Sequence, residues 1–232
     1  MLLNENEIFD IYTRFVMPKY NNIEKYNNLP LEFNNKNWKW EDKDFPRVIS
    51  LIEFKEFMEV NNNPKFENVL SFNGQNDPEY EYLNYTNIIN YNYTDDTIKY
   101  DLHNLDIDKK DFDFFMSNQT LEHLYDPCLV LRNIYEHMKP GGIVYMNLPS
   151  MNMPHSTPLH YYTGFTPVGL GCIFKQAGFE ILDIGFWGNS NYYDFILNKG
   201  IWPDYRQMTN YSYEKDKEAI TWIFARKPIN SI

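Results

Sequence analysis

The sequence FDFFMSNQTLEHL (residues 112–124) begins the stretch that decides the fold. It starts as a short apolar run, continues as a polar loop, and leads into a helical pattern that stops at KPGG (residues 139–142). Asp126 is a good N-cap, Pro127 suits the first helical position, and a Pro-Gly-Gly sequence ends a helix. A second apolar run, residues 143–147, follows at once. A strand, a helix and another strand in this order are typical of a parallel sheet.

The same alternation extends outward in both directions. Thr166 and Pro167 start another helix, which ends at Gly178 and leads into an apolar run. Apolar spacing predicts two earlier helices, one around residues 8–15 and one over residues 47–60. The candidate strands cover residues 68–72, 87–91, 98–102, 113–117, 143–147, 180–185 and 220–226. We therefore predict an α/β fold with a mostly parallel sheet.

Composition narrows the class of protein. The chain has 232 residues, of which 43% are hydrophobic and 23% charged, as in a globular protein of one domain. Its apolar runs are far shorter than the roughly 20 residues that cross a bilayer, and its N-terminus lacks the basic residues of a signal peptide. With two Cys, we expect a cytoplasmic protein with reduced thiols and no membrane contact. A net charge of −11 argues against nucleic acid as a partner and favours a small-molecule or carbohydrate substrate.

Three segments subdivide this single domain, residues 1–232. Residues 1–46 form an N-terminal helical and irregular extension, and residues 47–232 form the body of the fold. Within the body, the aromatic-rich insertion 186–216 separates the last two strands, and we expect it to cap a substrate or to pack against the equally aromatic N-terminal segment.

These fragments, in this order, resemble the second half of class I S-adenosylmethionine (SAM) dependent methyltransferases of the type 11-like group. Residues 112–123 resemble the fourth strand and following loop of that family, residues 139–149 the turn and fifth strand, and residues 220–227 its final antiparallel strand. The resemblance implies a Rossmann-like sheet of seven mostly parallel strands, with helices on both faces and an antiparallel last strand. It also implies SAM as the cofactor, bound across the carboxyl ends of the strands, where open α/β sheets generally bind ligands.

The cofactor half of the resemblance is degenerate. Gly74 alone remains of the glycine-rich loop that follows Phe72. About a dozen residues lead from Gly74 to the next strand, which is near the lower limit for a crossover containing a helix, so this helix is predicted to be short or absent. The resemblance offers Asp95 or Asp96 for the ribose hydroxyls. It places Asp101, followed by Leu102, against the adenine, and Asn118 and Gln119 at the methionine end.

Three histidines are candidate proton acceptors for methyl transfer to a hydroxyl, because imidazole is the commonest base at neutral pH. His123 follows the fourth strand of the family pattern, and His155 and His160 follow the fifth. A purely structural role for His123, through a Glu-His pair, remains the alternative. The resemblance to metal-assisted relatives would need an acidic residue where Gln119 stands, so we predict no metal.

Substrate contacts are expected from Tyr161 and Tyr162 in the loop that carries these histidines, and from Arg206 in the insertion. One hypothesis is a methyltransferase for a small hydroxylated acceptor, such as a sugar of a surface glycan. A second is a degenerate methyltransferase-like scaffold, partner subunit or binder of another ligand, and a homo-oligomer is possible in either case. A nucleotide-sugar-binding module or another Rossmann-type enzyme is a third. Space for adenosine against Asp101 favours the enzyme, and Phe72 or Tyr80 filling that space favours the scaffold.

Overall fold

A six-stranded sheet is the centre of the fold. The computed structural model describes residues 2–21, 23–27, 44–72, 77–91 and 101–229. Within them the strands are β1 (Lys65–Phe72), β2 (Asn84–Tyr91), β3 (Phe112–Asn118), β4 (Met138–Pro149), β5 (Glu180–Trp187) and β6 (Ile220–Arg226). Their order across the sheet is β2-β1-β3-β4-β6-β5.

The strand directions confirm the predicted mixed sheet. Strands β2, β1, β3 and β4 run parallel, and β6 is antiparallel to both of its neighbours. The predicted number of seven strands was wrong for the described residues, which contain six. Of the predicted strand 98–102, residues 98–100 lie outside the described residues. Asp101 instead caps the short helix η6 (Leu102–Asn104), because its side chain accepts a hydrogen bond from the His103 amide.

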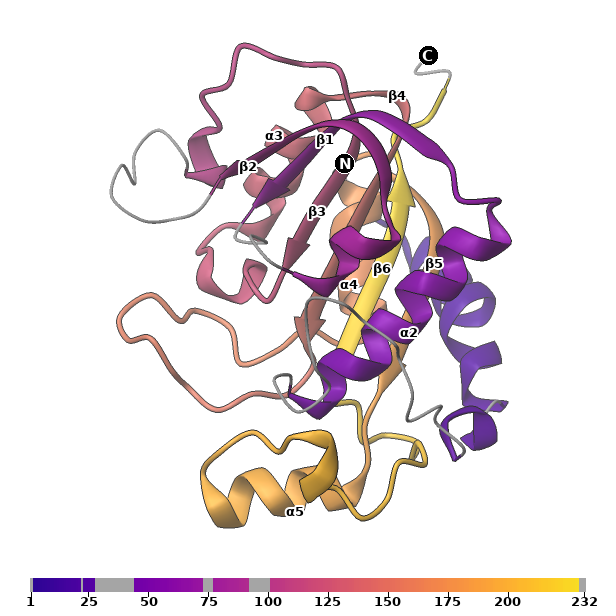
Figure 1. Cartoon of the computed structure of the whole chain (residues 1–232), viewed down its shortest axis with the longest axis vertical. Helices are drawn as coiled ribbons and strands as arrows, with labels where there is room; N and C mark the ends of the chain where they lie inside the picture. The colour runs from indigo at the N-terminus through magenta and orange to yellow at the C-terminus, as the bar shows by residue number, and fades with distance from the viewer. Residues whose placement is uncertain (1, 22, 28–43, 73–76, 92–100, 230–232) are drawn as a thin grey trace.

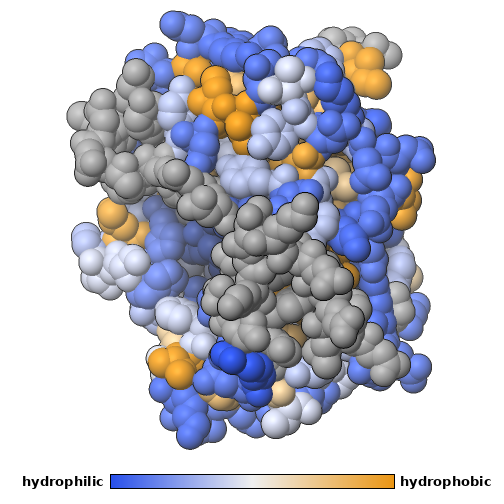
Figure 2. Space-filling model, viewed as in Figure 1, coloured by the Kyte–Doolittle hydropathy of each residue, from blue (hydrophilic) through white to orange (hydrophobic). Residues whose placement is uncertain are grey.

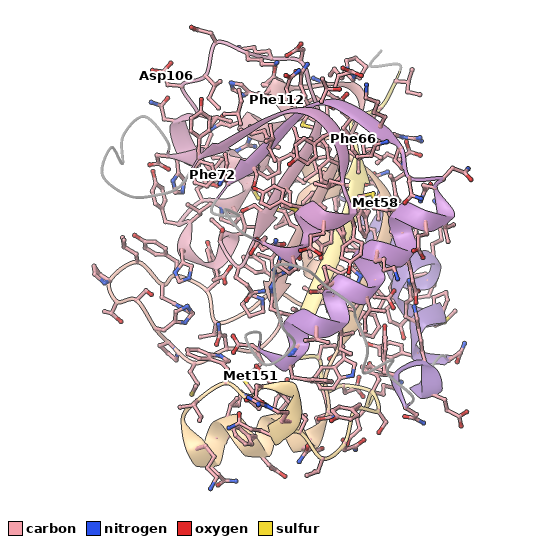
Figure 3. The ribbon with its side chains drawn as sticks, viewed as in Figure 1. Met58, Phe66, Phe72, Asp106, Phe112 and Met151 are labelled. Atoms are coloured by element: carbon pink, nitrogen blue, oxygen red, sulfur yellow. The ribbon has the colours of Figure 1, made fainter. Side chains whose placement is uncertain are left out.

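Burial explains why the sequence forms these strands. All seven residues of β3 are buried, as expected for a central parallel strand covered on both faces. Strand β2 has no buried residue, which fits a strand at the edge of the described sheet. Figure 3 shows Phe66 and Phe112 near the starts of β1 and β3, whereas Met151, just beyond β4, lies at the opposite end, where the parallel strands finish.

Helices cover both faces of the sheet, as predicted. Helix α2 (Phe45–Val60) crosses one face, while α3 (Pro127–His137) and α4 (Pro167–Gln176) lie behind the sheet in Figure 1. On the α2 side, Phe57 stacks on Phe224 with 3.6 Å between ring centroids, and Phe54 meets Tyr145 at 4.6 Å. These aromatic contacts anchor the second half of α2 to β4 and β6.

The predicted caps are confirmed. Asp126 accepts a hydrogen bond of 3.0 Å from the Leu129 amide at the start of α3, and Thr166 accepts one of 3.1 Å from Gly169 at the start of α4. Gly178 ends that second helix with a φ of +103°, which favours glycine. Each cap fixes the residue at which its helix begins, and therefore where the loop from the preceding strand ends.

The KPGG sequence differs from the predicted turn. Helix α3 ends at His137, and residues 138–142 already belong to β4. The extension is stabilised by Lys227, whose carbonyl accepts from Gly141 N and whose amide donates to Gly142 O. Lys227 follows the end of β6, far away in the sequence, and its hydrogen bonds make these glycines part of the sheet.

The short crossover between β1 and β2 is confirmed. It contains η5 (Pro78–Tyr82), one 3-10 helix of five residues, in the described part of the connection. The predicted sites at Gly74, Asp95 and Asp96 lie outside the described residues, as do residues 28–43 of the N-terminal extension. The rest of that extension contains α1 (Glu5–Ile11), η1 (Tyr12–Val16), η2 (Met17–Asn21) and η3 (Ile23–Tyr26), and Ile11 packs close to Gly171 of α4.

The aromatic insertion forms a separate layer beyond the sheet. Its helix α5 (Ser190–Lys199) and the short η8 (Tyr205–Gln207) lie below the strand ends in Figure 1. The start of α2 holds this layer, because the Phe45 amide donates to the Pro203 carbonyl at 2.8 Å and the Phe45 ring lies 4.8 Å from Trp187. Tyr20 of the extension also contacts Phe186, at 5.2 Å. Packing against the N-terminal segment, one of the two expected roles, is therefore observed.

The surface shown in Figure 2 is mostly hydrophilic where residues are described, with hydrophobic residues in small separate patches. Among the described helices, none combines the length and the apolar character needed to cross a bilayer.

Candidate functional site

Two cavities lie at the end of the sheet where the parallel strands finish. The first, here called the switch-point cavity, has a volume of about 380 Å³ and is lined by residues that include Phe72, Asp101, Thr120, His123 and Tyr161. The second, here called the β4 cavity, has a volume of about 220 Å³ and is lined by residues that include Arg47, Gln119, Glu122, His155 and Trp202.

The switch-point cavity takes its name from the strand order. The chain moves from β1 to β2 on one side and then crosses to β3 on the other side of β1. Phe72 is the last residue of β1, and Thr120 follows the end of β3. Ligands of open α/β sheets bind in the crevice formed at such a reversal, outside the carboxyl ends of the strands. The cavity is therefore where the fold itself predicts a ligand.

Asp101 and Leu102, the predicted adenine contacts, lie in the wall of the switch-point cavity. The Asp101 side chain is about one third exposed, and its Oδ1 lies 2.7 Å from Nδ1 of His103. The Asp126 amide donates to Nε2 of His103 at 3.2 Å, so the ring proton lies on Nδ1 and points at Asp101. The His103 ring also stacks on Tyr125 at 3.9 Å. These contacts hold the Asp101 carboxylate in a fixed orientation.

Asn118 and Gln119, at the end of β3, belong to a buried polar network. Asn118 donates to Asp77 at 2.6 Å and accepts from Asn147 at 2.5 Å. Gln119 donates to Asn147 Oδ1 at 2.8 Å and has a φ of +51°, an uncommon value for a residue other than glycine. The Asn118 amide thus bonds protein groups through both its nitrogen and its oxygen, and Gln119, which bonds Asn147 through its nitrogen, also lines the β4 cavity.

A buried ion pair, not identified from the sequence, supports this network. Arg47 of α2 donates two hydrogen bonds to Glu79 of η5, at 2.8 and 3.1 Å, and lies 3.6 Å from Asp77. The Glu79 side chain is fully buried. Burial raises the pKa of Glu79, and Arg47 opposes the rise. The two residues are 32 positions apart, so no local sequence pattern connects them.

The three predicted histidines converge. His123 ends η7 (Leu121–His123), while His155 and His160 lie in the loop after β4. The ring centroids of His123 are 4.8 Å from His155 and 5.2 Å from His160, and those of His155 and His160 are 4.4 Å apart. His123 lines the switch-point cavity and His155 the β4 cavity, so the cluster lies between the two.

Burial favours the neutral form of two of these rings. Desolvation lowers the pKa of His123, against a hydrogen bond to the Leu159 carbonyl that raises it, and the neighbouring His155 lowers it further. Desolvation, followed by His155 and His123, also lowers the pKa of His160. Neutral imidazoles can accept protons or bind metal ions.

Glu122 is another charged residue that the sequence did not single out as a site residue. Its side chain is 1% exposed, and neither carboxylate oxygen has a hydrogen-bond partner among the described residues. Oε1 lies 4.0 Å from Nε2 of His123. Burial raises the pKa of Glu122 to about 7. A loop position next to a strand gives no sequence signal for such burial, because loop residues are usually exposed.

The three expected substrate residues differ in position. Tyr161 lines the switch-point cavity. The Tyr162 hydroxyl donates to the Tyr125 carbonyl at 3.0 Å, which ties the histidine loop to the loop after η7. Arg206 is 58% exposed and pairs with Asp204 at 3.4 Å, and it lines neither cavity. From the insertion, Tyr192 and Trp202 reach the site and line the β4 cavity. The Trp202 ring lies 5.5 Å from His155, and its Nε1 donates to Asn152.

Comparison with known proteins agrees with the fold described above. Residues 55–146 match the model of the methyltransferase domain family. The cyclase SpnF has a similar structure, with a TM-score of 0.54 and 14% identity over 97% of this chain and 95% of that chain. An S-adenosylmethionine-dependent methyltransferase from Clostridium acetobutylicum is similar with a TM-score of 0.51 and 13% identity, over 81% of this chain and 93% of that one. No curated protein matches the chain.

Proposed function

Because the chain carries a methyltransferase-family segment on the fold of class I methyltransferases, we propose that it binds SAM and transfers its methyl group to a small acceptor. The observation that carries the proposal is the switch-point cavity, which lies at the fold's predicted ligand position and has Asp101 in its wall. Its volume of about 380 Å³ is within the usual range for small-molecule sites. A cavity that both Phe72 and Asp101 line supports the enzyme hypothesis over the scaffold hypothesis.

The two cavities suggest a division of roles. Asp101 and Leu102 would hold the adenosine part of the cofactor in the switch-point cavity, and Gln119, which lines the β4 cavity, would lie beside the methionine end. The bound cofactor would supply an electrophilic methyl group. The acceptor would then occupy the β4 cavity, on the other side of the histidine cluster.

The β4 cavity favours a small hydroxylated acceptor, such as a sugar. Its volume of about 220 Å³ suits a single ring, and the aromatic side chains of Tyr192 and Trp202 line it together with Asn152. Aromatic faces beside polar groups are suited to carbohydrate rings. The chain would hold the acceptor oxygen in line with the methyl group, since positioning can supply most of the catalysis. The cluster of His123, His155 and His160 would handle the hydroxyl proton.

One observation favours a second candidate, a methyltransferase-like protein that binds another ligand. The side-chain amide of Asn118 is bonded to Asp77 and Asn147, and the Gln119 Nε2 donates to Asn147, so these donors already have protein partners. A fold of this kind is also found in a protein described as a cyclase. This candidate predicts that the switch-point cavity binds another ligand and has no measurable affinity for SAM.

Calorimetric titration with SAM and with S-adenosylhomocysteine tests the proposal. Asp101→Asn removes the charge but keeps the oxygen that orients His103, and Asp106→Asn is the matched control, since Asp106 is exposed and lines neither cavity. We expect micromolar binding to the parent and to Asp106→Asn. A charged hydrogen bond contributes about 1.5–3 kcal/mol, so Asp101→Asn should bind about 10 to 100 times more weakly. No binding of either ligand at millimolar concentration by the folded parent protein would refute the proposal.

A further inference from the structure

The histidine cluster brings three potential metal ligands together. One ring nitrogen from each of His123, His155 and His160 lies within 4.8 Å of the others. We propose that these residues, with Glu122, form a binding site for a divalent transition-metal ion between the two cavities. The sequence argued against a metal because Gln119 is not acidic, whereas Glu122, three residues later, supplies the carboxylate.

The rings are oriented as metal-binding histidines usually are. Nδ1 of His123 lies 2.7 Å from the Leu159 carbonyl, and Nδ1 of His155 lies 3.0 Å from the Met153 carbonyl. Metal ligands commonly donate the second ring N–H to a carbonyl or carboxylate, which fixes the tautomer and leaves the other nitrogen free to coordinate. In this arrangement Nε2 is the coordinating atom of both residues.

Two further groups lack the partners that buried polar atoms need. Nε2 of His160 is buried and has no hydrogen-bond partner among the described residues, and Nδ1 of this ring accepts a long hydrogen bond of 3.4 Å from the His155 amide. Coordination through Nε2 would therefore move the ring proton to Nδ1 and break that hydrogen bond. Both carboxylate oxygens of Glu122 also lack a hydrogen-bond partner among the described residues, and the Glu122 side chain is only 1% exposed. Burying an unpaired carboxylate is costly. A cation held by the three rings on the Glu122 side of His123, whose Nε2 lies 4.0 Å from Glu122 Oε1, would give the buried carboxylate a partner.

The ligand types decide the class of ion. Imidazole nitrogen suits Zn²⁺, Co²⁺, Ni²⁺ and Fe²⁺, whereas Mg²⁺ and Ca²⁺ prefer sites made of oxygen atoms. With metal–nitrogen distances of about 2.0–2.1 Å, tetrahedral ligand nitrogens stand about 3.3 Å apart. The present separations, up to 4.8 Å, therefore need to contract by about 1.5 Å. Two of the rings share one loop, so small rotations of side chains and loop suffice.

The position of the site links it to the reaction. Glu122 and His155 line the β4 cavity, and His123 lines the switch-point cavity. If the proposed function holds, an acceptor hydroxyl that binds this ion would lose its proton more easily, because bound metal ions lower the pKa of coordinated oxygen. The histidines would then act on the proton through the ion instead of as free bases. This last step rests on the proposed function, whereas metal binding does not.

Metal binding can be measured without SAM. Protein stripped with a chelator is titrated with Zn²⁺ by calorimetry and with Co²⁺ by visible absorption, with Mg²⁺ as the comparison ion. We expect one Zn²⁺ or Co²⁺ per chain, a Co²⁺ spectrum typical of nitrogen ligands, and no comparable binding of Mg²⁺. Circular dichroism confirms that each protein is folded.

Variants separate this site from adventitious binding. Glu122→Gln should weaken Zn²⁺ binding at least about tenfold, and the double variant His155→Gln, His160→Gln at least about a hundredfold, since even outer-shell changes cost 10- to 100-fold. Glu136→Gln, at an exposed position on α3, is the matched control and should bind as the parent does. Unchanged affinity in the folded double variant, or no stoichiometric binding by the parent, would overturn the proposal. SAM titration of the metal-free protein tests the proposed function separately.

Discussion

The buried pair of Arg47 and Glu79 gives a quantitative test of what supports the site. Glu79→Gln removes a fully buried charge, while Arg47, whose side chain is 12% exposed, remains in place. Breaking a buried ion pair by removing one partner costs about 3–5 kcal/mol. Asp77 still lies 3.6 Å from Arg47, so we expect the lower end of this range, about 3 kcal/mol of unfolding free energy.

Urea unfolding, followed by the fluorescence of the buried Trp187 and Trp222, measures this loss. Arg14→Met is the control, because Arg14 forms an exposed pair with Asp10 and its loss should change the free energy of unfolding by less than about 0.5 kcal/mol. A cost below about 1 kcal/mol for Glu79→Gln would show that solvent reaches the pair, and it would refute the reasoning.

A double-mutant cycle separates the pair from its surroundings. Arg47→Met leaves Glu79 buried without its main cation, and we expect a similar loss of about 3 kcal/mol. Because each single variant orphans the other partner, the double variant should be more stable than the sum predicts by at least about 2 kcal/mol. Additive losses would mean that the two side chains do not interact in solution.

The loss of unfolding free energy caused by Arg47→Met should depend on pH. Burial raises the pKa of Glu79 above its usual value even beside Arg47, and losing the cation raises it further. A carboxyl whose folded pKa is raised favours folding at low pH, and this contribution is lost as the pH rises through the folded pKa. The cost of Arg47→Met should therefore be smaller at pH 4.5 than at pH 8 in the same urea assay. A cost that grew toward acid pH would contradict the assigned cause.

Two further predictions concern backbone positions and caps. Gly188→Ala should cost about 3 kcal/mol or more of unfolding free energy in the urea assay, because the added Cβ would lie 1.7 Å from the Lys217 carbonyl oxygen. At Gly200 an added Cβ meets open space, so Gly200→Ala should cost only about 1 kcal/mol, for its positive φ. Equal losses at the two glycines would contradict this packing. Asp126→Ala should cost about 1 kcal/mol, seen as a lower thermal midpoint, because the Leu129 amide loses its cap, and full stability of this variant would show that water replaces the cap.

The parts of the fold that could be predicted depend on neighbours in the sequence. Asp126 and Thr166 mark the starts of their helices by residue type alone, and the short crossover after β1 follows from the number of residues between the two predicted strands. The KPGG segment was misread as a turn, because its pairing with Lys227 lies more than 80 residues away in the sequence. Local signals thus place the elements but do not determine how far each strand extends.

The site shows the same limit. The sequence placed His123, His155 and His160 near the strand ends, where open α/β sheets bind ligands, and the family resemblance alone suggested Asp101 as a cofactor contact. Their convergence within 4.8 Å depends on how the loop after β4 folds back over η7. The burial of Glu122 arises from that same loop, whose Tyr161 and Tyr162 amides donate to the Glu122 carbonyl. Tertiary contacts of this kind leave no periodic pattern in the sequence.

The layer beyond the sheet, built by residues 186–216, contacts the two cavities unequally. Tyr192 and Trp202 wall the β4 cavity, while the residues that line the switch-point cavity all come from outside this segment. Substitutions in the insertion can therefore reshape one compartment and leave the other unchanged. If the two compartments hold different molecules, relatives of this protein can diverge in what they modify while keeping the same reagent, and exchanging this one segment is the direct way to transfer such a preference.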